Sequence, residues 1–209
     1  MKIQNIYHLL QAALLMLLAA SCTQEEFPAA QDKAQQLTIS VTDGGYASAE
    51  DKTTRAVENG YTTEFTEGDA CGFYMVRGGK PVYSNVKLTA ERDAATGSLV
   101  WKPEAGTTLA GGLQDEVYYL YYPYRSDLDN TVISNLLKHA IENPQESFFK
   151  PIMNNWPVKT DQSSYADYTA SDLMTASCTP TLDNGAVRLD FVMTHALSLV
   201  VIEMPKTVY

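Results

Sequence analysis

The histidines of this chain are the side chains best suited to acid–base chemistry, and they do not belong to a catalytic motif. His8 falls in an apolar N-terminal segment and His139 on an expected helix, which leaves His195 between two expected strands. The sequence contains no phosphate-binding glycine loop, nucleophile elbow or HExxH pattern. Since catalysis needs several groups that act together, we expect no enzyme, no cofactor and no metal. His195 is expected to be a hydrogen-bonded residue of the core.

A cysteine thiol at position 22 could carry a lipid. Lys2 supplies a positive charge, residues 9–18 form an apolar run, and residues 19–21 are the small residues that precede a signal-peptidase cleavage site. This order is typical of a bacterial lipobox. It predicts a signal peptide over residues 1–21 and an acylated Cys22 as the first mature residue, which would attach the protein to the outer membrane.

Two other interpretations of this segment stay open. It could be a plain secretory signal followed by a chance cysteine, or a membrane helix, for which the apolar run is short. Residues 23–26 end in two glutamates and resemble the acidic surface-export signal of lipoproteins in Gram-negative anaerobes.

The charge of the chain excludes one class of partner. Lys and Arg number 15 against 25 Asp and Glu, which gives a formal net charge of −10. An acidic surface repels phosphate backbones and anionic lipid head groups, so we expect no nucleic-acid partner.

Composition and patterning predict an all-β fold, a β-sandwich with one or two short helices. Tyrosines number 13, and β-branched and aromatic residues favour strands. Residues 37–42 alternate apolar and hydroxyl side chains, which predicts a first strand that buries Leu37, Ile39 and Val41 and stops at residues 43–45. The other expected strands are residues 70–76, 82–89, 98–102, 117–122, 186–192 and 196–202.

Two segments show other patterns. Residues 133–141 have apolar residues at helical spacing, and residues 171–176 are expected to form a capped helical turn or loop. Within the strand at 82–89, Val82, Val86 and Leu88 are expected to share one face.

Tyrosines dominate the strongest strand signal of the chain. In residues 117–122, Tyr119 and Tyr121 are expected on the opposite face from Tyr118. Rows of aromatic rings can stack sugars, so Tyr119, Tyr121 and Trp156 are candidate ligand-stacking residues, with burial in a core as the alternative. Trp101 is expected to be a core aromatic.

Two further groups of residues have competing interpretations. An exported compartment would permit a disulfide between Cys71 and Cys178, but we favour buried free thiols, because two cysteines define no framework. Asp127, Asp129 and Asn130 could suggest calcium, yet they lack the full ligand series of a calcium loop, so a solvated turn is favoured.

The order of several short motifs resembles the fimbrillin (Mfa-like) family, whose members are subunits of type V pili in Gram-negative anaerobes. These motifs are Thr-Arg-Ala at 54–56, Glu-Gly-Asp-Ala-Cys-Gly-Phe-Tyr at 67–74, Tyr-Pro-Tyr at 122–124, Asp-Gln-Ser at 161–163, Ser-Asp-Leu-Met-Thr-Ala at 171–176, Phe191, and His-Ala-Leu-Ser at 195–198. The resemblance implies a transthyretin-like, Greek-key β-sandwich, a second sandwich after it, and assembly into a surface fimbrium.

The resemblance also divides the chain and gives the first strand a role. Residues 22–36 would be a tether, residues 37–186 the N-terminal sandwich, and residues 187–209 its final strands or the start of a truncated second sandwich. A trypsin-like protease would cut between Arg55 and Ala56. The first strand would then leave, and a strand from another pilus subunit would take its place.

The alternatives are that Arg55 is an ordinary surface arginine, that the protein is an uncut, non-polymerising pilus anchor, or that it is a monomeric surface lipoprotein that binds glycans. Host proteins or glycans are further partners that an adhesive subunit would bind.

Overall fold

The computed structural model describes residues 34–46, 63–128, 130–183 and 186–198. Cys22, Arg55 and Ala56 lie outside these residues, as does most of the strand expected at 196–202. Contacts divide the chain into Met1–Gln31 and Asp32–Tyr209, and every described residue belongs to the second unit.

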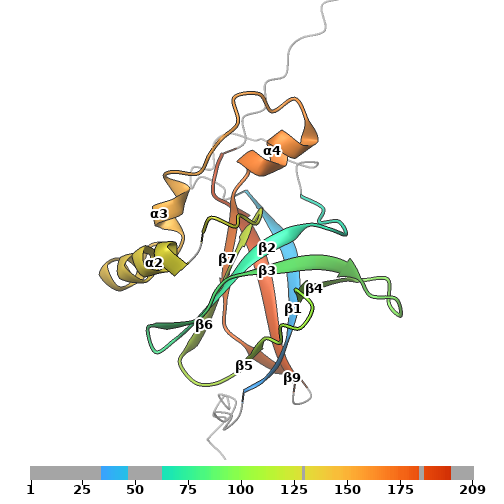
Figure 1. The fold of residues 1–209 in the computed structure, drawn as a ribbon, viewed down its shortest axis with the longest axis vertical. Coiled ribbons are helices and arrows are strands. Elements are labelled where there is room, and N and C mark those ends of the chain that lie inside the picture. The colour runs from blue at the N-terminus through green and yellow to red at the C-terminus, as the bar shows by residue number, and fades with distance from the viewer. Residues whose placement is uncertain (1–33, 47–62, 129, 184–185, 199–209) are drawn as a thin grey trace, which may run out of the picture. The chain divides into compact units, whose positions relative to one another are not determined.

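The expected all-β fold is confirmed, in the form of a single curled sheet (Figure 1). The strands are β1 (Gln35–Tyr46), β2 (Ala70–Arg77), β3 (Lys80–Arg92), β4 (Leu99–Pro103), β5 (Ala110–Gly111), β6 (Glu116–Tyr122), β7 (Met174–Cys178), β8 (Thr181–Asp183) and β9 (Ala186–His195). They follow the order β4-β3-β2-β6-β7-β9-β1-β5, and β8 pairs with β9 outside this path. Among the described strands, only β1 and β9 pair in parallel.

Three short helices accompany the sheet in the described part of the chain: α2 (Asn130–Glu142), α3 (Lys150–Met153) and α4 (Tyr165–Ser171). The helix expected at 133–141 is confirmed as α2, with Leu136 fully buried, although Ile141 is 72 % exposed. Of the helices the structure describes, none is long and apolar enough to cross a membrane.

The sheet has an apolar cluster on each side, because alternate residues of a strand point to opposite faces. The inner core lies inside the curl and includes Phe73 of β2 and Tyr118 of β6. The outer core lies between the sheet and helices α2 and α3, and includes Tyr74 of β2 and Tyr121 of β6. The predicted alternation of the tyrosine-rich strand is therefore confirmed.

Two predictions about strand boundaries are wrong. Residues 43–45 do not stop β1, which continues through a register shift until Tyr46 pairs with His195. Gly44 permits this continuation because it has no side chain. A Cβ at this position would lie only 2.7 Å from Val192 Cγ1. Of residues 171–176, expected to form a helical turn or loop, Ser171 ends α4, whereas residues 174–176 begin β7, which pairs with β6 and β9.

A bulge in β3 overturns the predicted face of Val82. Asn85 has a φ of 49°, and the pairing with β2 shifts between Val86 and Tyr83. The extra residue reverses the alternation, so Tyr83 packs against the inner core and Val82 is exposed.

Cys71 and Cys178 are both free thiols, as favoured from the sequence. Burial raises the pKa of the Cys178 thiol to about 12, helped by the nearby Asp190, and burial raises the pKa of Cys71 well above its usual value. At pH 8 the native thiolate population should be lower than in the unfolded chain by roughly a thousand-fold or more. We expect iodoacetamide to label both cysteines slowly in the native protein and rapidly in guanidinium chloride. Peptide mass spectrometry would check this, and a Cys71–Cys178 cross-linked peptide would contradict it.

Candidate functional site

Strand β1 occupies an edge of the sheet and is bonded mainly along one side. It runs parallel to β9, from Leu37 opposite Val187 to Asp43 opposite Met193. On its other side, within the described residues, β1 pairs with β5 only at Gln35 and Gln36. The amide of the next residue, Leu37, donates to the Leu109 carbonyl. Gln35 and Gln36, expected in the tether, therefore belong to the strand.

The inner face of β1 completes the inner core. Leu37 and Ile39 are buried and Val41 is partly buried, as their alternation predicted. Further along the edge, a groove of about 350 Å³ lies between β1 and β4 and is lined by Leu37, Trp101 and Leu109. Two polar clusters hold the ends of the strand.

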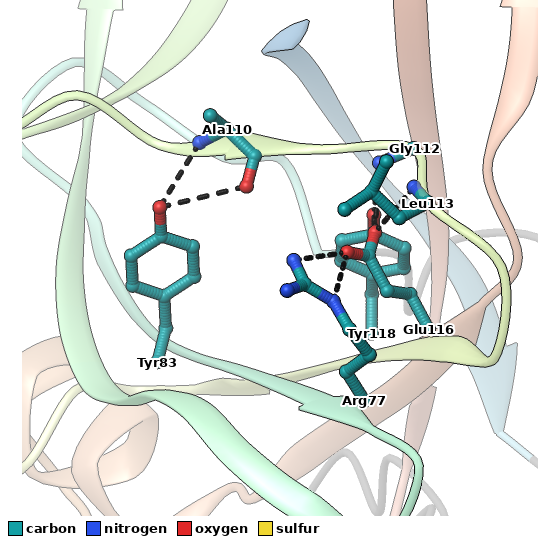
Figure 2. A network of polar contacts seen from close by, with 7 residues as sticks. All are labelled: Arg77, Tyr83, Ala110, Gly112, Leu113, Glu116 and Tyr118. Carbon is teal, nitrogen blue, oxygen red and sulfur yellow. Dashed lines mark hydrogen bonds and ion pairs between the residues drawn. The ribbon is translucent and has the colours of Figure 1, made fainter. Parts of the chain in front are cut away.

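The Glu116 cluster holds the start of β1 (Figure 2). The Glu116 side chain is 0 % exposed and accepts hydrogen bonds from Arg77 Nε at 2.8 Å and Nη2 at 2.6 Å. It also accepts from the amides of Gly112 at 2.7 Å and Leu113 at 3.1 Å, and from the Tyr118 hydroxyl. Burial, and then this bond to Glu116, raise the pKa of Tyr118, so its hydroxyl stays protonated and donates.

These contacts fix strand β5, the partner of the first residues of β1. The amides that Glu116 binds follow directly after β5, and the Ala110 amide within β5 donates to the Tyr83 hydroxyl at 3.1 Å. Figure 2 shows Tyr83 below Ala110 at one end of this segment and Glu116 below Gly112 and Leu113 at its other end. The cluster thereby positions the edge that Gln35 and Gln36 pair with.

The His195 cluster holds the end of β1 and consists of Asp43, Tyr46, Tyr168, Asp172 and His195. His195 Nδ1 donates to Asp172 Oδ2 at 2.8 Å, because a carboxylate can only accept. His195 Nε2 faces Asp43 Oδ1 at 3.4 Å, and it makes no hydrogen bond within the described residues. His195 is therefore a buried, hydrogen-bonded residue, as expected from the sequence.

Tyr46 adds an aromatic contact to this cluster. Its ring stacks on the His195 ring with centroids 3.8 Å apart, and its hydroxyl lies 3.1 Å from that of Tyr168. Burial and the bond to Tyr168 raise the pKa of Tyr46. The cluster thus ties together β1, β9 and the segment around α4.

Asp43 also accepts hydrogen bonds from residues before and after the segment that contains Arg55. Its Oδ1 accepts from the Gly45 amide and its Oδ2 from the Thr63 amide, both at 2.7 Å. Gly45 and Thr63, which lie on either side of residues 47–62 in the sequence, therefore donate to the same carboxylate. The sequence did not identify Asp43 as a site residue, because an Asp-x-Gly pattern predicts only a turn.

The structure does not support the candidate ligand-stacking residues as one platform. Tyr121 is fully buried and Trp156 is 7 % exposed, and their rings pack together with centroids 6.2 Å apart in the outer core. Tyr119 is half-buried and stacks on Phe148 at 3.9 Å. Trp101 is buried in the inner core, as expected. The helices that follow β6 cover the rings of Tyr121 and Trp156, and the sequence does not show which strand face such helices will cover.

Asp127, considered for calcium, pairs instead with Arg125, whose Nε donates to Asp127 Oδ1 at 3.0 Å. Its neighbour Asp129 lies outside the described residues.

The fold is that of an all-β protein in which β1 lies at an edge of the sheet. Residues 54–208 match the family model described as fimbrillin-like, and the chain belongs to this family, as the motif order indicated.

The chain is also similar to a Bacteroides ovatus protein with the provisional name fimbrium tip subunit Fim1C. The two are 32 % identical over 209 residues, which cover 97 % of this chain and 36 % of that protein. The chain therefore spans little more than a third of that relative. A crystal structure of a fimbrial protein from Bacteroides ovatus is similar with a TM-score of 0.57 and 28 % identity, over 78 % of this chain and 29 % of the other.

Proposed function

We propose that this protein is a subunit of a surface fimbrium that assembles by strand exchange. In this proposal β1 leaves the sheet, and an extended strand of another subunit takes the place beside β9. The observation that carries the proposal is the position of β1: it is an edge strand at the start of the described fold, paired along most of its length with β9 alone.

The energetics of the vacated position favour its being refilled. Leu37 and Ile39 are buried by the inner core, and burying one such side chain stabilises a fold by about 1.5–3 kcal/mol. Removing β1 would expose this part of the core together with the unpaired backbone groups of β9. An open strand edge lined with apolar residues is a template for another strand.

Processing and location are further parts of the proposal. Residues 1–21 would direct export and Cys22 would carry a lipid that attaches the chain to the outer membrane. Cleavage between Arg55 and Ala56 would free the rest of the chain from the lipid and from β1. The name of the Bacteroides ovatus relative supports a position at the fimbrium tip.

Replacing Arg55 by alanine is expected to block both processing and assembly. In cells that build the filament, mass spectrometry of the wild-type protein in purified filaments should find Ala56 as the first residue. Arg55→Ala should retain Cys22 and reduce incorporation into filaments at least ten-fold, because β1 still fills the site. Lys52→Ala removes a neighbouring basic residue and serves as the matched control. Wild-type filament subunits that still contain residues 35–46 would overturn the proposal.

The same experiment separates the alternatives. An uncut anchor would be recovered from filaments only with an acylated Cys22 start. The monomeric glycan-binding alternative has less support, since Tyr121 and Trp156 are buried.

A further inference from the structure

We infer that the site occupied by β1 selects the strand that replaces β1 through a carboxylate on that strand as well as through its apolar side chains. The strand that fits would run parallel to β9, with apolar residues at i, i+2 and i+4 and an Asp or Glu at i+6, the positions of Leu37, Ile39, Val41 and Asp43. This inference rests on the proposed strand exchange and adds the chemistry of the partner strand.

The carboxylate of Asp43 is buried and binds groups that would remain after β1 leaves. Its side chain is 5 % exposed, and the His195 side chain that it faces is 1 % exposed. The Thr63 amide donates to Asp43 Oδ2 at 2.7 Å. Thr63 and His195 both follow residues 47–62 in the chain, so a cut after Arg55 leaves them with the subunit.

If the incoming strand lacked this carboxylate, neither the Thr63 amide nor the His195 ring would have a carboxylate in the position of Asp43 to face. The partly buried Thr63 amide would lose its acceptor, which costs free energy because the donor is left without a partner. Asn could supply its one oxygen to Thr63, but its NH2 group, which can only donate, would then face His195 Nε2 in place of Asp43 Oδ1. An apolar residue would provide neither interaction.

The position of His195 also sets where the carboxylate falls in a strand parallel to β9. His195 ends β9, and Tyr46 of the parallel β1 pairs with it. In a parallel strand the carboxylate at i+6 therefore follows the apolar residues and reaches this end. On the other side of the His195 ring, Asp172 accepts a hydrogen bond from Nδ1. Nε2 is therefore the nitrogen that is directed at Asp43.

The outward-facing positions of β1 restrict the residue type of an incoming strand less. Thr38 is exposed, and its backbone partner on β9 is Arg188. An acidic residue at position 38 would thus meet a positive charge without replacing the contacts of Asp43. This position provides a charge-matched control.

A peptide exchange experiment tests the inference on the full chain. The protein is nicked by limited trypsin digestion within residues 47–62 and purified with β1 still bound. Fluorescent peptides with the sequence of Gln35–Tyr46 then compete for the site, and anisotropy gives their affinities. We expect the Asp43→Asn peptide to bind at least ten-fold more weakly than wild type. The double variant T38D/D43N has the wild-type net charge and should bind as weakly as D43N.

The outcomes separate this inference from the proposed function. If the wild-type peptide exchanges and D43N binds within two-fold of it, the carboxylate requirement is wrong and strand exchange stands. If the nicked protein never accepts the wild-type peptide, strand exchange fails.

A second measurement tests Asp43 in the uncut chain whatever the peptide result. Hydrogen–deuterium exchange of residues 35–46 should be at least ten-fold faster in Asp43→Asn than in wild type. Ser40→Ala is the control, since Ser40 bonds to Asp190 on the exposed face of the same strand pair. Equal protection of β1 in the Asp43 and Ser40 variants would overturn the inference.

Discussion

Glu116→Ala should lower the free energy of unfolding by about 2–4 kcal/mol. The Arg77 side chain left behind is 38 % exposed, so the loss is smaller than that for breaking a fully buried ion pair. The Glu116 side chain is fully buried, and Arg77 donates two hydrogen bonds to it. Its loss would also leave the Leu113 amide without its acceptor, while the Gly112 amide would keep only the Tyr118 hydroxyl as an acceptor. An unsatisfied buried donor costs about 1–3 kcal/mol, which supports a large total.

The effect should extend to the edge of the sheet. Since Glu116 anchors the segment after β5, hydrogen–deuterium exchange should rise at residues 110–113 and at the first residues of β1. Urea denaturation gives the change in stability. Glu91→Gln is the matched control, because Glu91 pairs with Lys102 at the surface and exposed pairs contribute about 0–1 kcal/mol. Equal losses in the two variants would contradict a structural role for the Glu116 cluster.

Gly72→Ala should cost about 3 kcal/mol or somewhat more, at or above the upper end for overpacking a core. A Cβ on Gly72 would lie 1.9 Å from Tyr121 Cε1 and 2.4 Å from Cζ. The Tyr121 ring cannot shift easily, because its hydroxyl donates to Asn85 Oδ1 at 2.7 Å and accepts from the Arg125 amide at 3.1 Å. The absence of a side chain at position 72 is thus what allows the ring to lie across β2.

Gly97→Ala is the control for this prediction. No atom lies within 4 Å of a Cβ there, and the φ of +71° leaves only backbone strain, which costs about 1–2 kcal/mol. Tyr121→Ala should also be destabilising, but the double variant with Gly72→Ala should lose clearly less than the sum of the two. Additive losses in thermal or urea unfolding would show that the contact with Tyr121 is not the cause.

The outcomes along the chain show which features are local. Alternation in β6 and β9 was predictable because the side-chain period of a strand depends on neighbouring residues alone. The bulge at Asn85 was not, because the positive φ that reverses the alternation of β3 is set by its pairing with β2. Gly44 and Gly45 misled for a similar reason: Gly44 makes room for Val192 of β9, and Gly45 has a φ of +79° within the register shift of β1, so neither ends the strand.

The site divides in the same way. The sequence by itself determined the all-β class, the family, and the apolar row of Leu37, Ile39 and Val41, since these follow from composition and short-range pattern. Only the tertiary structure decided that β1 lies parallel to β9, about 150 residues away, and that Glu116 and Asp43 are buried. A charged side chain is buried only where the folded structure pairs it and supplies hydrogen bonds to it. The donors for Glu116 and Asp43 come from β2, β6, the segment after β5, and Thr63 beyond residues 47–62, and the sheet brings them together.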